Sequence, residues 1–497
     1  MEVSLVFSKR RRKVAMLGFD AAEFSYIAAN LPSLPNFRRA LSAGVFRHLD
    51  SPAQWMPGSV WPTFYTGSPP GEHGIHHLMQ WDRDAMRLRR VAADWLYTEP
   101  FWRGLERRGL KTIAIDVPMT FAPDRGAGVE VSSWGAHDQI VAFAAWPREL
   151  KAEIKRRFGE HPMGIEIPVD KSLGERMRVR SNLVAGVPIK AELVRWLLTS
   201  RDWDFFIGVF GESHRGGHIL WPDGDDGEST IPPSALLDVY IALDRALGDV
   251  LTAIDLNRTT VVLFALHGMG SNLSQEHFVN PLMDRINVRF SELEPSLFAR
   301  AGAPRQRSAM RFLRENLPPR LQTIVANLVP QHVRDRVVDS SFTSGYDWPH
   351  TPGLALRADN NGYLRFNVKG REKIGMLEAG SATLSRYEDL IRDSFSSLRN
   401  DKGEPLVNEV FNAAERFPGT RSDRLPDLIV TWNGLDPASH VSSSLGTLDA
   451  HLDTGRGGNH RAAGFQILLE AGVEQACEAP PLAATDFAPS IVRLFDS

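Results

Sequence analysis

The sequence predicts an α/β fold built around a mostly parallel sheet. Short apolar runs recur along the 497 residues, each about as long as a buried strand, and stretches with apolar residues at three- and four-residue spacing lie between them. Such alternation is typical of a doubly wound sheet flanked by helices. Polar side chains suited to metal binding or nucleophilic attack also follow several of the runs, at the sheet edge where open α/β folds place their sites.

Six apolar runs are the predicted strands. They span residues 14–19, 111–117, 204–210 and 259–266, and later 428–432 and 465–469. Each gives way to polar or turn-forming residues, as expected where a buried strand ends. The clearest helical pattern covers 234–254, and another helix is expected to begin near 34–36.

Two stretches depart from this alternation of strands and helices. Residues 150–195 carry many charges at helical spacing, and residues 285–345 are Arg-rich and helical with proline breaks. We interpret the second stretch as an inserted helical cap, so that 14–284 and 346–497 form one catalytic core. The cap arginines either line a solvated helix face or attract anions toward a cleft.

Composition places the chain among ordinary soluble globular proteins. Hydrophobic residues make up 43% and charged residues 24%, which is enough apolar side chain for a large core. The net charge of −3 gives no global electrostatic reason to expect a nucleic acid polymer or a membrane surface as partner. The basic run at 9–13 is interpreted as a solvated arm.

The cysteine content and the hydropathy pattern indicate a cellular compartment. Cys477 is the single cysteine, which excludes an intramolecular disulfide and a Cys-rich metal site. No uninterrupted apolar stretch reaches the ~20 residues of a membrane span, and the N-terminus lacks the apolar segment of a signal peptide. We therefore expect a cytoplasmic protein without a membrane span.

Two early segments offer a carboxylate and a hydroxyl. Asp20 follows the first apolar run, where it can point into a crevice at the sheet edge or simply cap a helix. Ser59 opens a turn into an apolar helix, and Pro62 fits the first helical turn. A hydroxyl there gains backbone N–H groups and a dipole that favour anions, so Ser59 is a candidate nucleophile facing phosphate. A capping role for Ser59 and a nucleophilic role for Thr63 are the alternatives.

Histidines follow three later segments. Glu212, His214 and His218 fall within seven residues and offer ligands suited to zinc or manganese. Paired surface histidines on a helix are the alternative, and the Gly-Gly pair between them argues against a helix. His267 follows the run 259–266, and His460 ends a glycine-rich loop that allows close backbone approach to a ligand.

Taken in this order, the segments resemble the type I phosphodiesterase/nucleotide pyrophosphatase family of the alkaline phosphatase superfamily. The similar segments are GFDAAE (18–23), TGSPPGEHGI (66–75), GESHRGGH (211–218), HGMG (267–270), LPDLIVTW (425–432) and GGNHRAAGF (457–465). The resemblance implies an alkaline phosphatase-like α/β fold, with a mostly parallel central sheet flanked by helices. It also implies two divalent metals per chain, usually zinc.

The resemblance assigns a role to each candidate residue. The matching metal ligands are Asp20 and His267 for one ion, and Glu212, His218 and His460 for the other, with His214 as an alternative to His218. Ser59, or alternatively Thr63, matches the nucleophile. Apart from the resemblance, Asn272 lies close behind His267 and is a candidate substrate contact, with a surface role as the alternative.

One position departs from the family pattern. Members generally carry Asp immediately before the histidine of the HGMG segment, and here the residue is Leu266, whose side chain cannot bind a metal. The first ion would keep Asp20, His267 and Ser59, and three protein ligands still make a catalytic zinc site. A one-metal enzyme is therefore an open alternative.

The resemblance predicts a metal-dependent hydrolase or transferase of phosphodiester or phosphoanhydride bonds. A Ser or Thr nucleophile would form a phospho-enzyme, and the substrate would be a small-molecule phosphate ester. Two alternatives stay open. One is a sulfuryl-ester hydrolase or transferase of the same superfamily. The other is a catalytically silent relative that binds a phosphorylated ligand, which Leu266 suggests.

Overall fold

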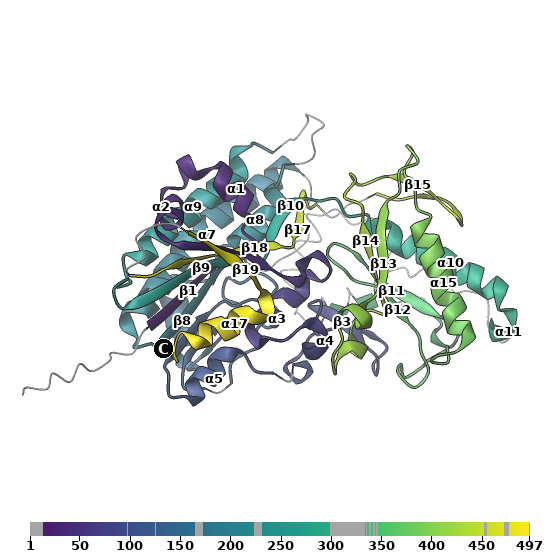
Figure 1. Cartoon of the computed structure of the whole chain (residues 1–497), viewed down its shortest axis with the longest axis horizontal. Coiled ribbons are helices and arrows are strands. Elements are labelled where there is room, and N and C mark those ends of the chain that lie inside the picture. Colours follow the sequence, from purple (N-terminus) through teal and green to yellow (C-terminus); the bar gives the residue numbers. More distant parts are fainter. Residues whose placement is uncertain are drawn as a thin grey trace, which may run out of the picture.

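The structure is a computed structural model of the chain and describes residues 13–496 with internal gaps. The gaps are 97, 125, 165–171, 223–230, 299–332, 334, 337–338, 341–342, 344–345, 452–454 and 472–476. Figure 1 shows two lobes: a core lobe built on a large sheet, and a second lobe built on a smaller one.

Nine strands form the central sheet, in the order β19-β2-β18-β9-β1-β8-β5-β6-β7. The strands are β1 (Lys13–Phe19), β2 (Val45–Asp50), β5 (Thr112–Ile115), β6 (Val129–Ser132), β7 (Ala144–Trp146), β8 (Phe205–Phe210), β9 (Thr259–Ala265), β18 (Ala463–Leu469) and β19 (Cys477–Ala483). The five strands from β9 to β6 run parallel, whereas β18 is antiparallel to both its neighbours. The predicted mostly parallel sheet is confirmed.

Helices cover both faces of this sheet, because its middle strands are apolar on both sides. Every residue of β8 and β9 is buried. One face packs against α1 (Phe24–Ala29), α2 (Pro35–Ala43), α6 (Glu149–Phe158), α7 (Leu173–Ser200), α8 (Glu212–Leu220) and α9 (Ser234–Leu251). The other packs against α3 (Val60–Thr66), α5 (Phe101–Arg107) and α17 (Ala484–Arg493). None of the described helices has the length and apolar character needed to cross a membrane.

The second lobe contains a four-stranded antiparallel sheet, in the order β11-β12-β14-β13. Its strands are β11 (Gly353–Leu356), β12 (Gly362–Phe366), β13 (Val407–Asn412) and β14 (Leu428–Trp432). One face packs against α10 (Val279–Leu293) and α15 (Ala382–Ser396), and the other packs against the hairpin of β3 (Met79–Asp82) and β4 (Arg87–Arg90). Short elements complete the chain: α4 (Pro70–His73), α11 (Pro295–Phe298), α16 (Ala413–Arg416), β15 (His440–Ser443) and β16 (Gly446–Asp449).

The strands of the predicted catalytic core lie in both lobes. The segment 346–497 is divided between the two sheets, since β11 to β14 form the second lobe while β18 and β19 join the central sheet. The predicted strand 428–432 has the expected bounds but lies in the second lobe as β14. Most of the predicted cap, 285–345, lies outside the described residues, so the cap stays a prediction.

A small ribbon connects the sheet edge to the candidate site. β10 (Gly268–Ser271) continues from the carboxyl end of β9 and pairs antiparallel with β17 (Gly458–Arg461), placing Met269 opposite His460. α8 begins two residues after β8, and Asp20 follows β1, which lies between β8 and β9. The carboxyl ends of three neighbouring parallel strands therefore deliver the candidate residues to one edge of the sheet.

Candidate active site

Asp20 is fixed by both of its carboxylate oxygens. The indole Nε1 of Trp61 donates to Oδ1 at 2.9 Å, and Nδ1 of His214 pairs with Oδ2 at 2.7 Å. The hydroxyl of Ser213 donates to the backbone carbonyl of Asp20 at 2.7 Å. Asp20 itself is buried. The structure thus joins the end of β1 to α8 and, through Trp61, to α3.

His214 and His218 project from one side of α8, because residues four apart share a helix face. All nine residues of this helix are buried, so the histidines are not solvated surface groups. The expectation that the Gly-Gly pair argues against a helix was wrong. A Cβ at Gly217 would lie 2.7 Å from Cγ of Met269, so this glycine lets β10 approach the helix closely.

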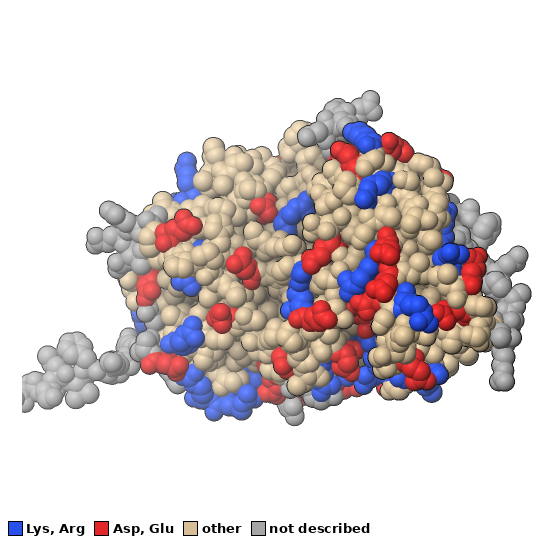
Figure 2. All heavy atoms as spheres, turned by 45° about the vertical axis from the view of Figure 1, so that its right-hand side comes forward, with Lys and Arg blue, Asp and Glu red and all other residues tan. Residues whose placement is uncertain are grey.

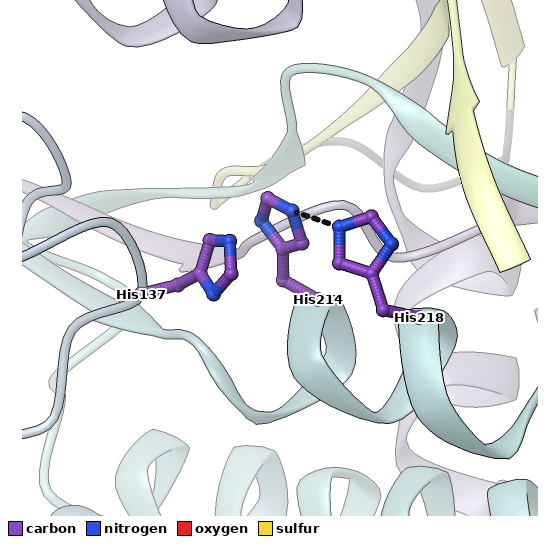
Figure 3. A group of neighbouring side chains, drawn as sticks. All are labelled: His137, His214 and His218. Carbon is purple, nitrogen blue, oxygen red and sulfur yellow. Dashed lines mark hydrogen bonds between the residues drawn. The ribbon is translucent and has the colours of Figure 1, made fainter. Parts of the chain in front are cut away.

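The hydrogen bonds of these two histidines leave their Nε2 atoms facing each other. Nδ1 of His214 meets a carboxylate, and Nδ1 of His218 lies 2.9 Å from the carbonyl of Gly458, so both Nδ1 atoms are donors. The two Nε2 atoms are 3.2 Å apart (Figure 3). Two nitrogens bound to one tetrahedral zinc at about 2.0–2.1 Å would lie about 3.3–3.4 Å apart, so the pair has the spacing of two ligands of one ion.

His137 is a third candidate ligand, which the sequence analysis missed. Its ring centroid lies 3.6 Å from that of His214, and the ligand atoms of His137, His214 and His218 all fall within 4.8 Å of one another. Figure 3 shows that His137 comes from a loop and the other two from α8. The loop follows β6, a strand of four residues that the apolar-run search did not find. A histidine just after a Trp-Gly turn was the available signal.

His214 also belongs to a second group, with His267 and His460. Nε2 of His267 lies 3.1 Å from Nδ1 of His460, which brings the end of β9 to β17. Burial lowers the pKa of His267 to about 3 and also lowers the pKa values of His218 and His460 well below their usual range. Neutral imidazoles each keep a lone pair for a metal.

The donor set fits a divalent cation. Nδ1 of His267 is buried and makes no hydrogen bond with any described residue. A buried polar atom of this kind normally has a partner, and an ion is one of the groups that explains its absence. Imidazole nitrogens with a carboxylate orienting one of them are the usual surroundings of protein-bound zinc.

The two candidate hydroxyls are both buried but have different partners. Oγ of Ser59 donates to the carbonyl of Met56 at 2.7 Å, and its side chain makes no capping bond to α3. Oγ1 of Thr63 lies 3.0 Å from Nε2 of His73. Nδ1 of His73 accepts from the N–H of Ile75, so Nε2 is the protonated nitrogen and donates to Thr63. Ser59 lies two residues before Trp61, which holds Asp20.

Glu212 does not join either histidine group. Its Oε1 lies 3.0 Å from Nε2 of His161, and both side chains are buried. Burial alone would raise the pKa of Glu212, but the Lys190 ammonium and His161 outweigh burial and lower it below its usual value. Glu212 precedes His214 by two residues, which places the two side chains on different sides of α8. Glu212 thus lies outside the two histidine groups, and the ligand role that the resemblance gives it stays a prediction.

Leu266 and Asn272, the other two positions singled out in the sequence, both contact the protein interior. Leu266 is buried in the apolar cluster on the α3 face of the sheet, where it packs with core side chains. Oδ1 of Asn272 accepts from Nδ2 of Asn459 at 3.2 Å, and its Nδ2 donates to the carbonyl of Arg456 at 3.2 Å. Asn272 therefore braces the segment that leads into β17.

Histidines and an aspartate that converge at the carboxyl edge of a mostly parallel sheet are the site of an alkaline phosphatase-like α/β hydrolase. The chain belongs to the type I phosphodiesterase / nucleotide pyrophosphatase family, whose model matches residues 14–434. It is accordingly a hydrolase of the phosphodiesterase/pyrophosphatase type. A comparison with curated proteins finds no match.

Solved structures share the fold over nearly the whole chain. Murine ectonucleotide pyrophosphatase/phosphodiesterase 5, an inactive variant in complex with AMP, is 13% identical with a TM-score of 0.52, covering 98% of this chain and 95% of that one. Phosphonoacetate hydrolase from Sinorhizobium meliloti in complex with phosphonoformate is 14% identical with a TM-score of 0.50, covering 98% and 96%. At these identities the likeness establishes the alkaline phosphatase-like fold.

Proposed function

We propose that the chain is a metal-dependent hydrolase of phosphodiester or phosphoanhydride bonds, with Ser59 as nucleophile. The observation that carries this proposal is the facing pair of Nε2 atoms of His214 and His218, 3.2 Å apart, with each Nδ1 held as a donor. With both Nδ1 atoms as donors, two unprotonated Nε2 atoms face each other at the spacing of two ligands, and a shared cation would stabilise that arrangement.

The residues that would hold the ion are the two histidine groups. They are His137, His214 and His218 in one group and His214, His267 and His460 in the other. Nδ1 of His214 is engaged by Asp20, so His214 has one nitrogen to offer. One imidazole nitrogen binds one cation, and we therefore propose one tightly held divalent ion per chain, with zinc preferred by the nitrogen ligands and manganese as the alternative.

The chemical step gives Ser59 the nucleophilic role that the family resemblance predicts for it. A bound divalent ion supplies positive charge that stabilises an ionised hydroxyl and the charge that develops on the phosphoryl oxygens. Oγ of Ser59 forms a bond to phosphorus while the bond from phosphorus to the leaving oxygen breaks, and the leaving oxygen takes up a proton. Water then hydrolyses the phosphoserine, or another hydroxyl accepts the phosphoryl group and makes the enzyme a transferase.

The face of the second lobe in Figure 2 favours a small-molecule substrate over a nucleic acid polymer. Figure 2 shows acidic and basic side chains interspersed over the second lobe on the face that it presents. A polymer of phosphates is usually bound by a continuous basic stripe. The solved relatives bind AMP and phosphonoformate, which are small anions of the proposed substrate class.

The nucleophile is tested by the matched variants Ser59→Ala and Thr63→Val, assayed against a chromogenic phosphodiester in phosphate-free buffer with metal content measured in parallel. We expect Ser59→Ala to lose turnover by about a thousandfold or more while retaining its metal, because one covalent step is removed. Thr63→Val should keep most of its activity. Wild-type turnover in Ser59→Ala would remove this residue from the mechanism, and loss of turnover in Thr63→Val alone would transfer the role to Thr63.

A second candidate function is a silent phospho-ligand-binding protein. Leu266 favours it, since this residue places an apolar side chain next to His267 where a carboxylate is usual in the family. Binding of AMP to the wild-type protein with no turnover of phosphodiesters, phosphomonoesters or sulfate esters would support it. Turnover of sulfate esters alone would instead identify the sulfuryl-transfer alternative.

A further inference from the structure

The loop between β6 and β7 brings His137 to the pair of histidines on α8. Its ring centroid lies 3.6 Å from that of His214 and 5.9 Å from that of His218. Figure 3 shows the ring of His214 between the other two. The facing Nε2 atoms of His214 and His218 belong to the group that contains His137, whereas His218 is absent from the group of His267 and His460. An ion at the facing pair therefore has His137 as its third imidazole.

Asp116, directly after β5, holds the backbone of this loop. Its Oδ1 accepts from the N–H of Trp134 and its Oδ2 from the N–H of Gly135, both at 2.8 Å. Nζ of Lys190 lies 2.9 Å from Oδ2 of Asp116 and donates to the carbonyl of Gly135 at 2.7 Å. Both charged side chains are fully buried. Together they fix the N–H and the carbonyl of Gly135, two residues before His137.

The backbone on either side of His137 is strained. Asp116, Ser133 and Asp138 have positive φ angles of 52°, 60° and 51°, a conformation that is costly for residues other than glycine. Strain of this kind persists only where surrounding bonds over-determine the backbone, and it gathers at functional sites. Three such residues around one loop indicate that its shape serves the side chain it presents.

Gly211, which precedes α8, lets the loop lie directly against the start of that helix. A Cβ at this position would lie 2.9 Å from the backbone nitrogen of His137 and 3.4 Å from the carbonyl oxygen of Gly135. The first distance is too short for a real Cβ contact, so any side chain here would push the loop away. The separation between His137 and the histidines of α8 therefore depends on this glycine.

We propose that His137 is the third imidazole ligand of the divalent ion and that Asp116 is a positioning residue that acts through it. This inference rests on the proposed function, which places one ion in the histidine groups, and it assigns that ion to His137, His214 and His218. Three imidazole nitrogens favour zinc over manganese, because manganese prefers oxygen ligands.

The test is a double-mutant cycle on the zinc affinity of the full-length protein, measured by competition with a chromophoric chelator. His137→Asn should weaken zinc binding by about 100-fold or more, because a ligand is lost. Asp116→Asn should weaken it by about 10- to 100-fold, the usual cost of losing a residue that orients a ligand. In the His137→Asn background, Asp116→Asn should cost less than about threefold more, because no ligand is left for Asp116 to position.

Asp244 provides a matched control. It is a buried carboxylate whose Oδ1 accepts from the backbone N–H groups of Asn36 and Phe37 at 2.9 and 2.8 Å, and so joins α9 to α2. Asp244→Asn removes the same kind of backbone anchor and should lower stability to urea while zinc affinity stays within about threefold. Equal losses of zinc affinity in Asp116→Asn and Asp244→Asn would reveal a general effect of destabilisation and overturn the positioning role.

The visible absorption of bound Co²⁺ gives a second readout, since it depends on the number, kind and geometry of the ligands. His137→Asn and Asp116→Asn should both change the spectrum of the Co²⁺-loaded protein, whereas Asp244→Asn should keep the wild-type spectrum. Gly211→Ala moves the loop without removing a charge, and it takes the place of Asp116→Asn in the cycle if that variant does not fold.

Two further outcomes would overturn the inference. One is unchanged zinc affinity in His137→Asn, and the other is losses from Asp116→Asn and His137→Asn that add in full in the double variant. A protein that hydrolyses phosphodiesters but binds zinc without His137 would retain the proposed function and refute this inference. A protein that binds zinc through His137 and turns over no ester would do the opposite. A wild-type protein that binds no zinc would refute both.

Discussion

The ends of β1 and β8 are alike in position but differ in what their carboxylates contact. Both strands are buried, parallel and adjacent, and a carboxylate follows each of them at the same edge of the sheet. Asp20, after β1, orients His214 and so belongs to the histidine groups. Glu212, after β8, faces His161 and Lys190 instead. The end of a strand places the residue that follows it at one edge of the sheet. The rotation of the following helix about its axis then determines which way the side chain points.

The side of α8 that carries Glu212 is held by a buried network. Nζ of Lys190 lies 2.9 Å from Oδ2 of Asp116 and donates to the carbonyls of Gly135 and Val209 at 2.7 and 3.1 Å. Asp116 in turn accepts from the backbone N–H groups of Trp134 and Gly135, both at 2.8 Å. This network fixes the loop that presents His137. The Glu212 side of α8 therefore faces this network, whereas the Asp20 side faces the histidine groups.

The largest expected effect is a loss of unfolding free energy when Lys190, in the network beside Glu212, is replaced. Lys190→Met leaves the carboxylate of Asp116 buried without its counter-charge, which costs about 3–5 kcal/mol of unfolding free energy. Urea denaturation followed by circular dichroism measures the change. Lys155→Met, at an exposed position, serves as control and should stay within about 0.5 kcal/mol. A change as small as the control's would mean that the Lys190–Asp116 pair does not hold this region together.

The next largest effect distinguishes the two carboxylates directly. Asp20→Asn weakens the orientation of His214 and should lower zinc affinity by about 10- to 100-fold, the usual cost of losing a residue that orients a metal ligand. Glu212→Gln should change it by no more than about threefold. Competition with a chromophoric chelator measures both constants. Similar losses in the two variants would show that Glu212 acts on the ion after all.

The smallest expected effect is the contribution of His267 to the pH dependence of the unfolding free energy, counted per pH unit. Unfolded, this histidine binds a proton below about pH 6.5, whereas in the folded chain burial keeps it neutral until about pH 3, an effect that His214 and His137 reinforce and Asp20 opposes. Protons therefore favour the unfolded state in that window. As the pH is lowered from about 6.5 to about 3, the unfolding free energy of the metal-free protein should decrease by up to about 1.4 kcal/mol per pH unit.

His267→Gln removes this contribution. The variant should show a flatter dependence of unfolding free energy on pH between about 6.5 and 3, measured by urea denaturation after chelator treatment. Glu212→Gln provides the contrast, because it leaves His267 in place and should keep the histidine's part of the slope. Parallel wild-type and His267→Gln curves would show that this histidine is not the source of the acid sensitivity.

The sequence was sufficient for the elements that determine the sheet. β1, β8 and β9 are long apolar runs, and α9 has a regular helical pattern, so period and length identified them. Asp20, His214, His218, His267 and His460 were found as candidates because each follows such a run or a glycine-rich turn, and the structure brings all five together.

Other features depended on information that a single sequence does not hold. His137 follows β6, whose four residues are too few to show a period. The direction of Glu212 depends on where the first turn of α8 begins, and one residue of shift would rotate it by about 100°. The second lobe was not separated from the core because β14 has the same apolar character as a core strand. Its partners, β12 and β13, are selected by tertiary pairing.

The turn at residues 357–361, between β11 and β12, ties the second lobe to the core. Asn361 is bonded to the carbonyls of Gln54 and Trp55, and Ser274 donates its hydroxyl to the carbonyl of Asn360 at 2.8 Å. A clamshell opening of the two lobes would break all of these bonds at once. Separating the lobes therefore costs at least the two bonds of Asn361, each worth about 0.5–1.5 kcal/mol.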